Sequence, residues 1–128
     1  MKKLIYKFLG ILNDSEILMQ AEAWAKKYYQ PEYFKIASIV MFVLHDQGGV
    51  NIPKTSPSSR FIEDLDLRDP LVQVEIISGI EEKFNIVIPD NKCEQFNRIN
   101  DLIEYIKKSY QIESANQLSA LLQAGSCS

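Results

Sequence analysis

The feature that most constrains the fold is the spacing of apolar residues, which recur every three or four positions in stretches separated by proline and glycine. Pro31, Pro70 and the pair Gly48-Gly49 mark the ends of these stretches. Proline begins a helix well but does not continue one, and glycine commonly ends one. Strand patterns are almost absent, because the one candidate, "NIVIP", is short and bounded by asparagine and proline. The sequence therefore predicts an all-α fold.

The first helix is predicted in "DSEILMQAEAWAKKYY", residues 14–29, where Asp14 or Ser15 can cap the first turn. Three-and-four spacing gives it one apolar stripe, made of Ile17, Leu18, Ala21, Trp24, Ala25 and Tyr28. A second helix is expected from Pro31 to Gly48-Gly49, and its apolar run belongs in a core. No apolar run in the sequence reaches the length of a membrane span.

A long connection is expected over residues 49–68, with apolar anchors at Phe61, Ile62, Leu65 and Leu67. The third helix is predicted over residues 70–84. Its core stripe is formed by Ile76, Ile77, Ile80 and Phe84. A single short helical turn is expected in residues 91–96, and a last amphipathic helix in residues 99–110, with Asn100 as its cap. The apolar side of that last helix is formed by Leu102, Ile103 and Ile106.

Composition excludes several kinds of function. A chain of 128 residues can build one core, and its net charge of −3 argues against nucleic acid as a general partner. One histidine, His45, and two cysteines, Cys93 and Cys127, cannot supply a usual metal site, and a disulfide framework is not expected. We expect Cys93 to be a small buried or half-buried side chain and His45 to be a surface or helix-capping residue. The sequence contains no paired acid and base and no glycine-rich phosphate loop, so it predicts that the protein is not an enzyme.

The side of the third helix opposite its core stripe mixes apolar and acidic residues. Its members are Leu71, Val74, Glu75, Ser78, Glu81 and Glu82. Acidity is concentrated around it, since residues 62–90 contain eight acids against two bases, Arg68 and Lys83. An apolar patch rimmed by acids suits a partner that brings apolar anchors and basic residues. In the alternative interpretation, Val72 and Val74 are ordinary core beneath the long connection or the N-terminal segment, and the pattern favours neither.

The segment "FIEDLDLRDPLVQVEIISGIEEKFNIVIPD" (61–90), followed by "IEYI" (103–106), resembles the acyl carrier protein family. The resemblance rests on "EDL", "VEII", "IEEKF" and "IPD" at near-family spacing, and it covers about residues 33–108. It implies a small helical bundle with a long first loop, to which this chain adds further helices at both ends. The expected organisation is an N-terminal helical extension (1–30), a carrier-like bundle (31–110) and a C-terminal tail that can add a helix (111–128).

The chain departs from the family where relatives carry their phosphopantetheine arm, on the serine of Asp-Ser-Leu. Aligned back from "VEII", that position is Pro70, and aligned forward from "FIEDL" it is Asp69. Neither residue has a hydroxyl, and the chain carries one extra residue in "DLDLRDPL". Asp69 can cap the helix and Pro70 suits its first position, so helix initiation is kept while the attachment chemistry is lost. No cofactor is expected, because the nearest hydroxyls lie too far from the motif: Ser58, Ser59 and Ser78.

The resemblance also implies docking of protein partners on the third helix of this chain. Carried over position by position, the contact residues are Leu71, Val74, Glu75, Ser78, Glu81 and Glu82. Two positions depart from the family, since Val72 replaces a common acid and Ser78 a common methionine. The predicted function is a non-catalytic, carrier-like structural or adaptor subunit of a larger complex, such as a mitochondrial respiratory complex, that binds a protein with a basic helical segment.

Alternatives remain open at this point. The protein could be an active acyl carrier or a regulator of acyl transfer that is modified at another hydroxyl, or a carrier-like adaptor of the bacterial cytoplasm. Residues 1–13, "MKKLIYKFLGILN", hold three lysines and no acid, so they suit a targeting segment or a short helix that packs its apolar side on a neighbour. We expect a mitochondrial location, with the bacterial cytoplasm as the alternative.

Overall fold

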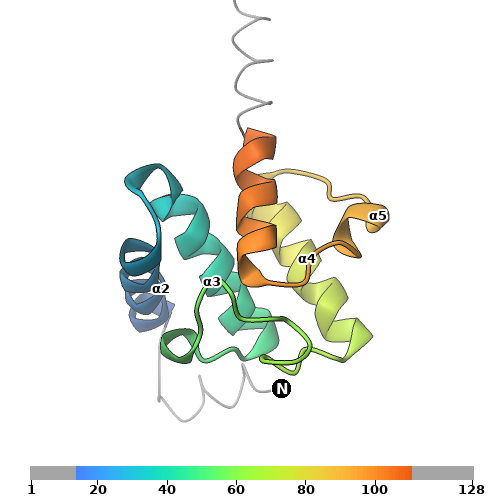
Figure 1. Cartoon of the computed structure of the whole chain (residues 1–128), viewed down its shortest axis with the longest axis horizontal. Helices are drawn as coiled ribbons and strands as arrows, with labels where there is room; N and C mark the ends of the chain where they lie inside the picture. Colours follow the sequence, from blue (N-terminus) through green and yellow to red (C-terminus); the bar gives the residue numbers. More distant parts are fainter. Residues whose placement is uncertain (1–13, 111–128) are drawn as a thin grey trace, which may run out of the picture.

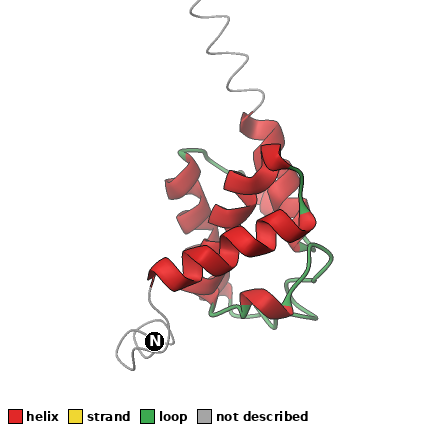
Figure 2. Ribbon diagram, turned by 90° about the vertical axis from the view of Figure 1, so that its left-hand side faces the viewer, coloured by secondary structure: helices red, strands yellow, loops and turns green. Residues whose placement is uncertain are grey.

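The computed structural model describes residues 14–110, and its helices follow the predicted breaks closely (Figure 1). The helices are α2 (Asp14–Tyr28), α3 (Phe34–Gly48), α4 (Pro70–Phe84) and α5 (Asp90–Cys93), with the short 3-10 turns η1 (Pro31–Tyr33) and η2 (Ile52–Lys54). A last helix covers residues 99–110. Within the described part of the chain no strand forms (Figure 2), which confirms the all-α prediction. The predicted C-terminal tail, 111–128, lies outside the described residues.

The central helix is α3, which packs between α2 on one side and α4 on the other (Figure 1). The close approach of α4 depends on Gly79, where an added Cβ would lie only 3.0 Å from Cγ1 of Val43. Gly49 caps the end of α3 at φ 67°, a left-handed conformation that glycine adopts without strain. One core results, built by α2, α3, α4, the long loop and the last helix. Its fully buried large side chains are Val40, Met41, Leu44, Ile52, Ile80, Ile99, Leu102, Ile103 and Ile106.

The predicted apolar stripes are confirmed at their centres and fail at their edges. In α2, the buried residues are Ile17, Ala21, Trp24 and Ala25. Leu18 and Tyr28, which the pattern placed on the same stripe, are 41% and 37% exposed. In α4, the core stripe is buried except for Ile77, which is only partly buried. The part of α2 and of α4 that is buried is therefore narrower than the apolar stripe in the sequence.

Side-chain hydrogen bonds join α2, and Tyr29 that follows it, to distant parts of the chain. The indole Nε1 of Trp24 donates to the carbonyl of Thr55 in the long loop at 3.0 Å, and both residues are buried. The hydroxyl of Tyr29 donates to Oδ1 of Asn100 in the last helix at 2.7 Å. Burial, aided by the negative charge of Glu104, raises the pKa of that hydroxyl. The helix that precedes the carrier-like region therefore shares its core.

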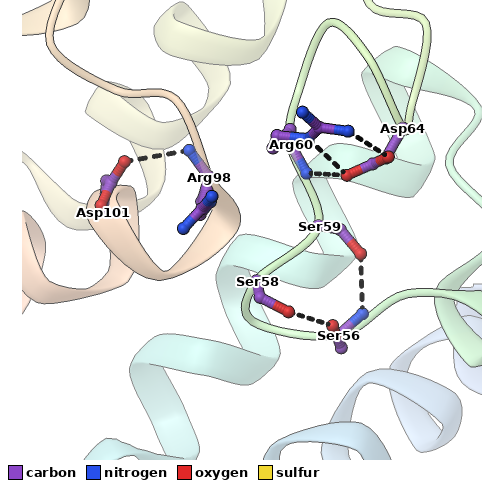
Figure 3. A network of polar contacts seen from close by, with 7 residues as sticks. All are labelled: Ser56, Ser58, Ser59, Arg60, Asp64, Arg98 and Asp101. Atoms are coloured by element: carbon purple, nitrogen blue, oxygen red, sulfur yellow. Dashed lines mark hydrogen bonds and ion pairs between the residues drawn. The ribbon is translucent and has the colours of Figure 1, made fainter.

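The long loop is fixed to the start of the last helix by backbone pairing. The N–H of Phe61 donates to the carbonyl of Asn97 at 2.9 Å, and the N–H of Ile99 donates to the carbonyl of Ser59 at 3.1 Å. This pairing sets Arg60 opposite Arg98 in an isolated antiparallel bridge. Figure 3 shows this junction, including the ion pair between Arg60 and Asp64 (3.2 Å).

The predicted cap of the last helix, Asn100, is wrong. Asn100 lies inside the helix, and its side chain accepts from Tyr29 instead. The carboxylate of Asp101 accepts from the backbone N–H groups of Asn97 and Arg98 at 2.9 and 3.0 Å (Figure 3). A residue of the first turn thus reaches back to satisfy amides that precede the helix, as in a capping box.

Candidate functional site

The start of α4 is built as the sequence predicts. Asp69 is the N-cap residue, with φ −70° and ψ 117°, and its Oδ1 accepts from the backbone N–H of Leu71 at 2.9 Å. Pro70 is the first helical residue, where a missing N–H costs nothing. The side chain of Gln73 donates to the carbonyl of Leu67 at 2.7 Å and holds the incoming chain against the first turn.

The segment that carries the extra residue turns sharply just before the helix. Asp66 adopts φ 55°, a left-handed conformation that aspartate tolerates better than most residues. The next residue, Leu67, is 6% exposed and belongs to the core. The turn therefore places the side chain of Leu67 in the core and leaves Asp69 at the N-cap position of α4.

These residues do not fit a phosphopantetheine arm. The arm needs a seryl oxygen at the helix start, and both Asp69 and Pro70 lack a hydroxyl. Ser78 is exposed but lies eight residues further along α4, which is about 12 Å of helix rise. Ser59 lies in the loop turn, where its Oγ accepts from the N–H of Ser56 at 2.9 Å (Figure 3).

One side of α4 is open to solvent and combines apolar and acidic groups. Leu71 is 65% exposed and Val74 is 60% exposed. We define the α4 face by its five exposed members: Leu71, Val74, Glu75, Ser78 and Glu82. The core interpretation is therefore wrong for Val74, which is a surface residue, whereas Val72 is partly buried against the core.

Glu81, a sixth residue assigned to partner contact, has a structural contact. It is only partly exposed, and its Oε2 accepts from the backbone N–H of Ile88 at 2.8 Å. This hydrogen bond holds the turn that follows α4. In that same turn Val87 is 83% exposed, the most exposed of the large apolar residues in the described chain. The exposure of Val87 could not be predicted from the sequence, because "NIVIP" carries no helical spacing.

A cavity of about 290 Å³ lies between the long loop, α4 and the residues around α5. Its apolar lining comes mainly from Phe61, Ile62, Leu67, Ile76, Ile77, Phe96 and Leu102. Cys93 also lines it and is half-buried with a free thiol, as predicted. Burial, followed by the negative charges of Asp90 and Glu81, raises the pKa of this thiol, so it is a weak nucleophile at neutral pH. The cavity could not be predicted from the sequence, because it arises from segments distant in the chain.

The sequence predicted neither a usual metal site nor a membrane-spanning helix. Among residues 14–110, no group of three or more histidine, cysteine, aspartate and glutamate side chains is arranged to hold a metal ion. Over the same residues, no helix has the length and apolar character that crossing a bilayer requires. His45 is half-buried near the end of α3, and its Nδ1 lies 2.9 Å from the carbonyl oxygen of Val50.

The long loop, the capped α4 with its acidic face, the short α5 and the closing helix define a small carrier-type helical bundle. The acyl carrier protein of Helicobacter hepaticus is 41% identical over 68 residues, which are 53% of this chain and 88% of that protein. That of Akkermansia muciniphila is 38% identical over 74 residues, 58% of this chain and 86% of that protein. That of Wolinella succinogenes is 40% identical over 65 residues, 51% and 84% of the two chains. No family model matches the sequence. The chain belongs to the acyl carrier protein family, as the sequence motifs indicated.

Proposed function

We propose that this protein is a non-catalytic, carrier-like adaptor or structural subunit, which binds a protein partner and holds no acyl arm. The observation that carries the proposal is the start of α4, where Asp69 caps the helix and Pro70 stands in its first position. These two residues preserve the helix geometry of a carrier without the oxygen to which an arm is joined. Members of the family carry groups rather than transform them, which agrees with the prediction that the chain is not an enzyme.

The α4 face supports the binding part of the proposal. Leu71 and Val74 expose more than half of their surface, and Glu75 and Glu82 lie beside them along the helix. A partner with apolar anchors and flanking lysine or arginine residues would remove the apolar surface from water and pair the carboxylates. The partner class is therefore a protein with a basic amphipathic segment. A mitochondrial respiratory complex remains the predicted setting, to be tested by identification of the proteins that co-purify.

The first test measures whether the protein accepts an arm. Wild type and Pro70→Ser are each incubated with coenzyme A and a broad-specificity phosphopantetheinyl transferase, and intact masses are recorded. We expect no mass gain for wild type and one arm on Pro70→Ser, because the substitution supplies the missing hydroxyl at an exposed helix start. A gain on wild type that disappears with Ser78→Ala or Ser58→Ala would overturn the proposal in favour of an active carrier.

The second test measures whether the α4 face binds a partner. Co-purification from native lysate is compared between wild type and Glu75→Lys/Glu82→Lys. We expect the double variant to lose its partners. The matched control is Glu22→Lys/Glu63→Lys, which makes the same charge change at exposed positions of α2 and the long loop. Equal recovery with both variants would exclude the α4 face as the contact surface.

A further inference from the structure

We propose that the α4 face binds residues 1–13 of a second copy of this chain. The inference rests on the proposed function, because it names the partner of the same face. The partner class defined above is an amphipathic segment with apolar anchors and basic residues. The chain contains such a segment in its own first thirteen residues.

The sequence "MKKLIYKFLGILN" has three lysines and no acid. With a helical period, its apolar residues Leu4, Ile5, Phe8, Leu9 and Leu12 fall on one side. Lys2 and Lys7 fall at the two edges of this stripe, and Lys3 falls opposite it. The segment therefore has a continuous apolar stripe with a lysine at each edge.

The α4 face complements that pattern in length and in charge. In helical form thirteen residues span about 20 Å, and the fifteen residues of α4 span about 22 Å. Leu71 and Val74 offer apolar contact to the stripe, while Glu75 and Glu82 offer carboxylates to the lysines. Charged pairs at the edge of such a contact set its orientation and its sensitivity to salt.

The position of α2 assigns the segment to a second copy rather than to its own α4. Only Asn13 lies between Leu12 and Asp14, the first residue of α2, and one residue spans at most about 3.6 Å. Because α3 lies between α2 and α4 (Figure 1), the axes of α2 and α4 are up to two helix packing distances apart, together about 16–20 Å. A reciprocal exchange between two copies places each segment on the other's α4 and closes a symmetric dimer.

The experiment measures the molar mass of the full chain by light scattering over a range of concentrations at low salt. We expect wild type to reach twice 14.7 kDa. Lys2→Glu/Lys3→Glu/Lys7→Glu should remain at one copy, and so should Glu75→Lys/Glu82→Lys. A chain with all five reversals should recover the dimer, because the charges are again opposite. The control Glu22→Lys/Glu63→Lys should stay dimeric.

Three results would overturn the inference. The first is a wild type that stays monomeric at every concentration, and the second is a dimer that survives either set of reversals. The third is binding of a monomer to anionic vesicles that needs the lysines but not Glu75 and Glu82, which would assign the segment to a membrane surface. If wild type is monomeric yet captures another protein through Glu75 and Glu82, this inference fails while the proposed function stands.

Discussion

Asp69 and Pro70 stabilise the start of α4 in two independent ways. The carboxylate of Asp69 accepts from the Leu71 amide, one of the amides that a helix start leaves without an internal partner. Pro70 fixes its own φ near the helical value and so reduces the conformational entropy that folding must overcome. Neither contribution requires a bound group, so the geometry of this end of α4 follows from the chain itself.

The cap makes a first prediction about stability. Asp69→Ala should lower the free energy of unfolding by about 1 kcal/mol, because the Leu71 amide loses its acceptor. Asp69→Asn, which keeps an oxygen at the same place, should change it by no more than a few tenths of a kcal/mol. Urea unfolding followed by circular dichroism measures both. Equal losses for the two variants would show that the cap is not what stabilises this end.

Glu81 and Glu82 are neighbours with different roles, which gives a second prediction. Glu81→Ala should cost about 1–3 kcal/mol of unfolding free energy, because it leaves the N–H of the buried Ile88 without its acceptor. Glu82→Ala, at an exposed position, should change stability by less than about 0.5 kcal/mol. Thermal unfolding of the two variants side by side checks this. Similar values for both would contradict the assigned roles.

At the scale of the elements, helix bounds were predictable because they depend on neighbours in sequence. Pro70, Phe84 and Gly49 mark bounds of α4 and α3 as local rules predicted. The cap of the last helix was not predictable in this way, because the side chain of Asn100 accepts a hydrogen bond from Tyr29, which is distant in sequence. Long-range contacts of this kind leave no mark on local spacing.

The candidate site shows the same division. The cap and proline at the start of α4 followed from local rules for helix ends, whereas the pattern left the exposure of Val74 open. The contact of Glu81 with the turn after α4 did not, since it depends on how that turn folds back. The cavity beneath the long loop also escaped prediction, because its walls meet only once the loop is paired with the last helix.

The attachment of α2 to the long loop gives a third prediction. Trp24→Phe should lower the free energy of unfolding by about 1–3 kcal/mol, because the buried carbonyl of Thr55 loses its donor. Trp24→Ala should cost about 3–5 kcal/mol through the additional cavity. Tyr28→Phe is the control, since its ring is partly exposed and remains in place. Denaturant midpoints measure the three variants, and the loss of stability should increase from Tyr28→Phe to Trp24→Phe to Trp24→Ala. An effect of Trp24→Phe no larger than that of Tyr28→Phe would contradict this prediction.

At the scale of the whole molecule, one buried cluster includes residues of α2, α3, α4 and the last helix. A single core of this size normally unfolds in one cooperative step. Trp24 is the only tryptophan of the chain, so its fluorescence reports on the packing of α2 against the long loop. Far-UV circular dichroism reports on all helices together.

The fourth prediction is that these two signals change at the same denaturant concentration. Coincident midpoints are expected because Trp24 and Ile17 are buried in the same cluster as Ile80 and Ile103. An earlier fluorescence transition would mean that α2 detaches first, and it would support the predicted division at residue 30 as an energetic boundary. The measurement needs only one equilibrium titration with both probes.

The backbone pairing between the long loop and the last helix limits how the loop can move away from that helix. The carbonyls of Pro57 and Ser59 accept from the amides of Asn100 and Ile99, and the carbonyl of Asn97 accepts from the amide of Phe61, so lifting the loop breaks three backbone hydrogen bonds at once. Movement of the loop away from the last helix is therefore governed by a local opening equilibrium of the backbone.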